Sequence, residues 1–231
     1  MLDLARQRCS AWLGRSILPA AILLPLAACS GGLEGRSDGG SGSPDLASRD
    51  VGGPDLGGQE PFVVELDTTA GIMAIQVFPS WAPLGARRVR ELVESGYYDG
   101  AAFFRVLPTF VIQFGLAADP DVTAMWLDRR LPDEPVMASN TERRVSFAAA
   151  GPDTRTTQLF INVADNARLD DMGFAPIGEV TEASFGVTLD IKPCYGEMPD
   201  QRRIRSDGAA YLEAEFPQLT IIRTATIRPP E

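Results

Sequence analysis

Two polar side chains interrupt a long apolar run near the middle of the chain. Arg105 and Gln113 fall within residues 103–115, where most of the other side chains are aliphatic or aromatic. Burying an arginine costs free energy unless its guanidinium is paired or used in chemistry. The run therefore predicts an arginine whose charged end reaches the edge of the fold or pairs with a carboxylate, or one whose guanidinium is used in chemistry.

The residue types that the sequence lacks exclude several kinds of active site. None of the 231 residues is histidine, so the chain has no Ser-His-Asp or Cys-His catalytic unit and no HExxH zinc helix. Asp165, Asp170 and Asp171 lack the spacing of an EF-hand, and we expect no metal and no other cofactor. With 31 acidic against 21 basic residues the net charge is −10, which argues against binding to nucleic acid.

Short apolar runs bounded by turn residues predict a mainly β domain that positions these side chains. The expected strands cover residues 62–66, 72–78, 102–107, 110–114, 145–149, 158–163, 175–180 and 219–227. One helix is expected from an N-cap at Ser80 through Val93, and an extra helix from Ser206 to Phe216. About eight short strands with one early helix indicate an antiparallel barrel or sandwich with helices at its ends.

The start of the chain has the three parts of a bacterial export signal. Residues 1–28 have a basic beginning and an apolar stretch from Ile17, which is shorter than the roughly 20 residues that span a bilayer. The ending Leu-Ala-Ala-Cys, residues 26–29, resembles the lipobox of lipoproteins, in which the chain is cut before a lipidated cysteine. We therefore expect lipid on Cys29; an ordinary secretory signal with a coincidental cysteine is the alternative.

A Gly/Ser-rich segment follows the expected lipidation site. Residues 29–60 predict a disordered tether with a root-mean-square span of roughly 30 Å, because their composition cannot form a core. Residues 61–231 then form one folded domain, a length that supports a single hydrophobic core. Cleavage before Cys29 leaves a mature chain with a net charge of −12.

Several ordered sequence blocks lie within the expected domain. They are Tyr98-Asp99-Gly100, Phe104 to Pro108, Phe110 to Gln113, Ala148 to Pro152, Gln158 to Ile161 and Leu169-Asp170. In this order and spacing they resemble the cyclophilins, a family of peptidyl-prolyl cis-trans isomerases. The resemblance covers residues 62–180 and extends more loosely to 227, and residues 155–162 with 173–176 look most like a bacterial branch.

The resemblance implies a fold, a catalytic pair and a pocket for proline. The fold would be a closed eight-stranded antiparallel β-barrel capped by two helices, with the extra C-terminal helix added. Arg105 matches the family's catalytic arginine, and Gln113 the glutamine that positions it. The matches to the substrate site are Phe110, Val111, Phe160 and Leu169 in the pocket walls, Ala148 and Ala149 in the strand that receives the substrate backbone, Gln158 in the groove, and Phe174, where relatives often have histidine.

Catalysis by such a site needs no histidine. Rotation about an X-Pro bond is slow because the amide has partial double-bond character, with a barrier of about 18 to 20 kcal/mol. In the twisted transition state the prolyl nitrogen regains a lone pair and accepts a hydrogen bond better than in the planar amide. A fixed donor on Arg105 would stabilise only the twisted form, by roughly 3 kcal/mol.

The resemblance also implies partners, and the export signal with its lipobox implies a location. We expect a monomer that acts on proline-containing unfolded or flexible polypeptides, binds no nucleic acid, and meets a membrane only through its lipid anchor. The protein would be exported and held on the bacterial cell envelope, at the outer membrane or facing the periplasm. The alternative is a non-catalytic module that binds proline peptides or acts as a chaperone.

Overall fold

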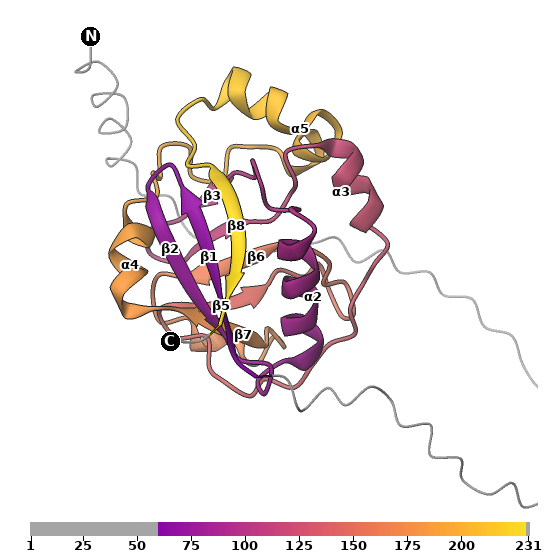
Figure 1. Ribbon diagram of the computed structural model, residues 1–231, viewed down its shortest axis with the longest axis vertical. Coiled ribbons are helices and arrows are strands. Elements are labelled where there is room, and N and C mark those ends of the chain that lie inside the picture. Colours follow the sequence, from indigo (N-terminus) through magenta and orange to yellow (C-terminus); the bar gives the residue numbers. More distant parts are fainter. Residues whose placement is uncertain (1–59, 230–231) are drawn as a thin grey trace, which may run out of the picture. The chain divides into compact units, whose positions relative to one another are not determined.

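The computed structural model describes residues 60–229 (Figure 1). The expected signal peptide (1–28), the expected lipidation site Cys29 and the tether as far as residue 59 lie outside the described residues. The fold below therefore concerns the domain expected from residue 61 onward. No helix in the described part of the chain is long and apolar enough to cross a membrane.

Eight antiparallel strands form one curled sheet in the order β3-β4-β6-β5-β7-β2-β1-β8. The strands are β1 (Phe62–Thr68), β2 (Gly71–Val77), β3 (Arg105–Val106), β4 (Val111–Phe114), β5 (Arg144–Phe147), β6 (Leu159–Asn162), β7 (Pro176–Val180) and β8 (Ile222–Arg228). Each overlaps a strand expected from the sequence, which confirms the mainly β class.

The expectation of a closed barrel is wrong, and the sheet is a curled half-barrel. β3 and β8 are its two edge strands. An isolated bridge between Ala102 and Ile221 and a hydrogen bond from the N–H of Gly100 to the carbonyl of Ile222 join the segment before β3 to the start of β8. β3 has only two residues, and the backbone N–H of Val106 donates to the carbonyl of Gly196 at 2.8 Å. Because a loop takes the free edge of β3, no continuous ladder to β8 closes the sheet.

Four α-helices accompany the sheet within the described residues, rather than the two cappers and one extra helix that were expected. They are α2 (Pro83–Glu94), α3 (Pro120–Trp126), α4 (Glu182–Leu189) and α5 (Gln201–Glu215). α2 packs against β7 and β8, α4 against β2, and α3 against α5 (Figure 1). The sequence predicted α2 and the second half of α5 and missed α3 and α4.

The beginning of α2 differs from the expected cap at Ser80. The N-cap residue is Ala82, which has no side chain that could accept a hydrogen bond. Instead the carboxylate of Glu134 accepts the backbone N–H groups of Leu84 at 2.6 Å and Gly85 at 3.0 Å. A distant residue thus satisfies the free donors at the helix start, which a local sequence pattern does not reveal.

The extra C-terminal helix α5 starts earlier than the predicted Ser206 and is kinked. Asp200 caps its start by accepting the N–H of Arg202 at 2.8 Å. The backbone breaks at Gly208, with φ of 60°, where the carbonyl of Ala118 accepts the N–H of Ala209 at 2.8 Å. The kink brings α5 against the start of α3.

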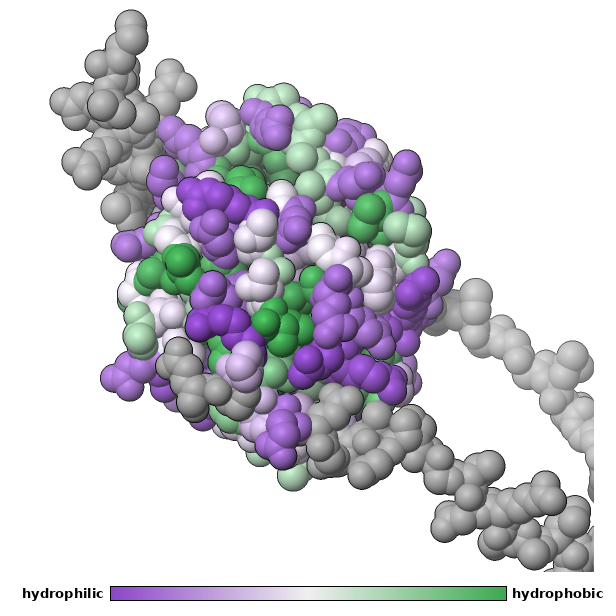
Figure 2. Space-filling view, viewed as in Figure 1, coloured by the Kyte–Doolittle hydropathy of each residue, from purple (hydrophilic) through white to green (hydrophobic). Residues whose placement is uncertain are grey.

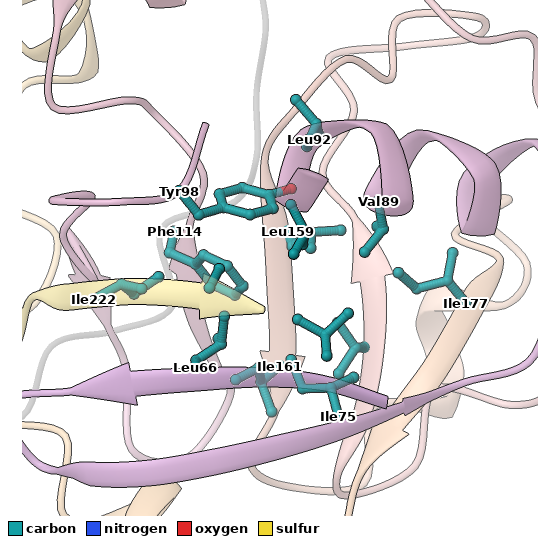
Figure 3. Close-up of a cluster of buried hydrophobic side chains, with 14 of the residues drawn as sticks. Leu66, Ile75, Val89, Leu92, Tyr98, Phe114, Leu159, Ile161, Ile177 and Ile222 are labelled. Carbon is teal, nitrogen blue, oxygen red and sulfur yellow. The ribbon is translucent and has the colours of Figure 1, made fainter. Parts of the chain in front are cut away.

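The main core lies between the curled sheet and α2. Figure 3 shows Val89 pointing from the helix toward the sheet that carries Leu66 and Ile75, and Leu92 belongs to the same buried cluster. The outer surface is different: on the face drawn in Figure 2, apolar residues form small separate patches among polar ones. The core therefore fixes the sheet, and with it the two strands that carry the expected catalytic pair.

Candidate active site

Arg105 and Gln113 lie directly opposite each other in the short β3–β4 ladder. Nη1 of Arg105 donates to Oε1 of Gln113 at 3.4 Å, and Nε2 of Gln113 donates to Oε1 of Gln158 at 2.9 Å. Gln113 is buried, and Gln158 directly precedes β6, the next strand of the sheet. Three expected site residues thus form one hydrogen-bonded row, from β3 through β4 to the residue before β6.

The guanidinium of Arg105 has a second polar partner that the sequence analysis missed. Its Nε donates to Oε2 of Glu197 at 3.2 Å, in an ion pair whose side chains are 22% and 56% exposed. Within the described residues no group accepts a hydrogen bond from Nη2. Arg105 therefore has both roles that its sequence context suggested: it is paired with a carboxylate, and it keeps an available donor.

The residues expected to hold a proline ring form a small apolar cluster of their own. Its members are the buried Val111, Phe160 and Leu169 with the partly buried Phe110, Ala148 and Phe174. The rings of Phe160 and Phe174 meet edge to face with centroids 5.6 Å apart. The guanidinium of Arg105 lies 5.8 Å from the ring centre of Phe110. The apolar cluster and the polar row therefore share one site.

Ala149 is the expected site residue that does not join this cluster. It is half-buried and follows β5, next to Ala148, whose N–H donates to the carbonyl of Gln158 at 2.9 Å. In the described residues no hydrogen bond engages the N–H of Ala149. Its backbone is therefore available to pair with an extended peptide.

A buried network of asparagines supports the pocket from behind, and the sequence analysis did not find it. Nδ2 of Asn166 donates to the carbonyl of Phe110 at 2.9 Å, and Nδ2 of Asn140 donates to the carbonyl of Phe174 at 2.7 Å. Asn162 links them by accepting from Asn166 at 2.8 Å and donating to Asn140 at 3.3 Å. These three polar side chains hold two pocket walls in place.

Asp170 anchors the same network at the surface of the domain. It accepts hydrogen bonds from the side chain of Ser139 and from both the backbone and the side chain of Asn140. Partial burial raises the pKa of the Asp170 carboxyl, but these hydrogen bonds outweigh it and the pKa lies below its usual value. The ionised form of Asp170 therefore favours the arrangement around Phe174.

Arg168 lies at the rim of the pocket. Its guanidinium is 4.8 Å from the ring centre of Phe110, on an exposed side chain. A cation thus covers part of an aromatic wall. No group of three or more Asp, Glu or Cys residues that could hold a metal occurs in the described part of the chain.

Comparisons with known proteins agree on one family. A model of the family described as cyclophilin type peptidyl-prolyl cis-trans isomerase/CLD matches residues 63–205. A peptidyl-prolyl cis-trans isomerase of Acinetobacter baylyi is 32% identical over 126 residues, which are 51% of this chain and 65% of that protein. The isomerase cyp18 of Streptomyces antibioticus is 34% identical over 131 residues, 52% of this chain and 76% of that protein.

Solved structures give the same fold. A cyclophilin-type isomerase of Cryptosporidium parvum matches with a TM-score of 0.55 and 21% identity, covering 74% of this chain and 100% of that one. Its structure in the presence of the dipeptide Ala-Pro matches with a TM-score of 0.52 and 23% identity, covering 73% and 99%. The chain spans 65% of the length of the Acinetobacter relative, and the family match covers most of the described domain. The chain therefore belongs to the cyclophilin-type peptidyl-prolyl cis-trans isomerase family.

Proposed function

We propose that this domain catalyses cis-trans rotation of X-Pro bonds in polypeptides. The observation that carries the proposal is the hydrogen-bonded row of Arg105, Gln113 and Gln158 beside the apolar cluster around Phe110 and Phe160. An apolar pocket next to a fixed donor is the arrangement that a prolyl amide requires. The membership in a family of isomerases supports the same activity.

The reaction follows from the donors that remain on Arg105. Gln113 occupies Nη1, and Nη2 is left to donate to the prolyl nitrogen as the amide twists and that nitrogen regains its lone pair. The planar amide offers no such acceptor, so the contact lowers the barrier without tightening the ground state. The proline ring would rest on the aromatic walls, and the flanking peptide would pair with the backbone at Ala149.

We also infer an exported lipoprotein of a bacterial branch of the family. The basic start, the apolar stretch and the ending at Cys29 support a lipid anchor, and residues 29–60 support a tether between anchor and domain. The substrates would be unfolded or flexible proline-containing chains outside the cytoplasm, met by a monomer on the cell envelope. Replacing Cys29 by alanine should move the protein from the membrane fraction to the soluble fraction.

Catalysis is tested with the purified full chain and an X-Pro peptide whose isomerisation is followed by NMR exchange. Arg105→Ala should lower kcat/KM by about a hundredfold, the loss expected for one preorganised donor. Ala148→Gly offers a comparison in the pocket wall: it leaves the donor intact, so it should raise KM and leave kcat near the wild-type value, whereas Arg105→Ala should lower kcat. Circular dichroism should show both variants folded.

The assay also separates the main alternative, a module that only binds. If the wild-type chain binds a proline peptide without accelerating its isomerisation, the domain is a binding or chaperone module. If Arg105→Ala keeps the full rate, the guanidinium is not the catalytic donor and the proposed mechanism fails.

A further inference from the structure

Glu197 contacts the arginine that we propose as catalytic, and it lies outside every sequence block of the family resemblance. Its Oε2 accepts a hydrogen bond from Nε of Arg105 at 3.2 Å, while Gln113 accepts from Nη1 on the other side at 3.4 Å. In the described residues these are the two polar side chains that engage this guanidinium. The plane of the group is therefore held along two edges, and Nη2 remains open.

We propose that Glu197 is a positioning residue, which keeps Nη2 of Arg105 aimed at the substrate. This inference rests on the proposed isomerase activity. The bond to Gln113 is long, and alone it leaves the guanidinium free to turn about its terminal torsions. A second acceptor on Nε restrains that rotation, and orientation of a donor matters strongly for the rate.

The loop that carries Glu197 is itself fixed to the strand that carries Arg105. The carbonyl of Gly196, the preceding residue, accepts the N–H of Val106 at 2.8 Å. This backbone hydrogen bond joins the residue after Arg105 to the residue before Glu197. The backbone hydrogen bond therefore keeps the two segments together and the side chains of Arg105 and Glu197 within reach of each other.

Helix α5 holds this loop from outside. The ring of Tyr195 packs edge to face on Phe216 with centroids 5.0 Å apart, directly after the last turn of α5. Both belong to a second apolar cluster, which also includes Phe104, the residue before Arg105. The C-terminal helix therefore braces both partners of the ion pair, which gives this additional element a function in the site.

Two effects of Glu197 oppose each other, and they are separable by kinetics. Its negative charge partly neutralises Arg105 and weakens the attraction for substrate carbonyls, so removal of the charge alone would lower KM. Positioning acts on the transition state, so removal of the acceptor lowers kcat. Because the pair is partly exposed, its removal should hardly change global stability.

The test compares Glu197→Ala with Glu197→Gln in the full chain, measuring kcat and KM by NMR exchange on an X-Pro peptide. Glu197→Ala should lower kcat on the order of tenfold, with KM unchanged or lower. Glu197→Gln keeps an oxygen acceptor for Nε and should remain within about twofold of wild-type kcat. The control is Asp67→Ala, which breaks an exposed pair with Arg223, 2.7 Å apart on β1 and β8.

A second measurement does not depend on activity. Exchange of the Nε proton of Arg105 with water, assigned by the loss of its signal in Arg105→Ala, should accelerate in Glu197→Ala and stay near the wild-type rate in Asp67→Ala. Wild-type kcat in Glu197→Ala, or equal losses in the Ala and Gln variants, would overturn the positioning role. If the wild-type chain has no isomerase activity, the proposed function fails instead. The wild-type assay shows this before any variant is compared.

Discussion

Glu134 and Arg155 form a buried ion pair at the start of α2, with 3.0 Å between Oε2 and Nη1. The same carboxylate accepts the N–H groups of Leu84 and Gly85, so it also caps the helix. We predict that Glu134→Ala lowers the free energy of unfolding by about 3 to 5 kcal/mol. The change removes the carboxylate nearest to the buried guanidinium of Arg155, which keeps the carbonyl of Pro132 and the more distant Asp133, and it leaves two helix donors without an acceptor. Urea denaturation measures the loss.

A surface ion pair on the same helix is the control. Glu94 lies 3.7 Å from Arg90 and is exposed, so Glu94→Ala should cost less than about 0.5 kcal/mol. In the background of Glu134→Leu, a further Arg155→Met should recover stability, since it removes a buried charge that has lost its nearest carboxylate and keeps only the more distant, half-exposed Asp133. Equal losses for Glu94→Ala and Glu134→Ala would contradict the structural role of the buried pair.

Gly208 provides a second stability test, at the kink of α5. An added Cβ would lie 2.3 Å from the carbonyl oxygen of Ala118, and the residue has φ of +60°. Gly208→Ala should therefore destabilise the domain by about 2 to 4 kcal/mol, combining left-handed strain with overpacking. Thermal unfolding followed by circular dichroism measures the change.

A glycine in α4 gives the opposite expectation with the same substitution. Gly186 is exposed, and an added Cβ there meets no atom within 4 Å. Gly186→Ala should stabilise the helix by about 0.5 to 1 kcal/mol. If Gly208→Ala were as harmless as Gly186→Ala, the close approach of α5 to Ala118 would be wrong.

The strands and the site residues were accessible from sequence because they depend on local pattern and on ordered motifs. Arg105 and Gln113 stand out as polar residues in an apolar run, and they meet across one two-residue ladder. The cap of α2 was not accessible, since Glu134 is 50 residues from Leu84. The local sequence around Glu134 does not indicate which distant backbone N–H groups its carboxylate will accept.

The half-barrel and the role of Glu197 were missed for a related reason. The free edge of β3 can pair either with β8 or with a loop. In this structure the loop occupies that edge, because the carbonyl of Gly196 accepts the N–H of Val106. That contact comes from the segment before α5, which lies beyond the sequence blocks that carried the resemblance over residues 62–180, although the family model extends to residue 205. The same contact brings Glu197 to Arg105.

Asp170 should make the pocket sensitive to acid. Its hydrogen bonds lower the pKa of the folded carboxyl, so its contribution to stability is present above the unfolded pKa and is lost as the pH falls through the folded pKa. We predict that wild type is more stable than Asp170→Asn by a constant amount from pH 7 down to about pH 5, and that the difference shrinks as the pH falls below the unfolded pKa of about 3.9. Melting temperatures measured across that range check the trend.

The neighbouring carboxylate separates this effect from a general loss of charge. Asp171 is exposed, so Asp171→Asn changes the net charge equally without touching the network around Asn140. Its melting temperature should follow that of wild type at every pH. Parallel pH curves for the two asparagine variants would exclude the proposed anchor.

Asp170→Asn should also raise KM for an X-Pro peptide, because Asp170 holds Asn140 and Asn140 holds the carbonyl of Phe174 in the pocket wall.

The proposed reaction itself should show little dependence on pH. Twisting an amide makes and breaks no covalent bond, and the contact from Arg105 donates a hydrogen bond without transferring a proton. The sequence contains no histidine that could titrate near neutrality. We therefore expect kcat/KM on an X-Pro peptide to stay within about twofold between pH 6 and 9, measured at constant ionic strength. A bell-shaped profile centred near pH 7 would mean that a general acid or base takes part, and the mechanism based on Arg105 and Gln113 would have to be abandoned.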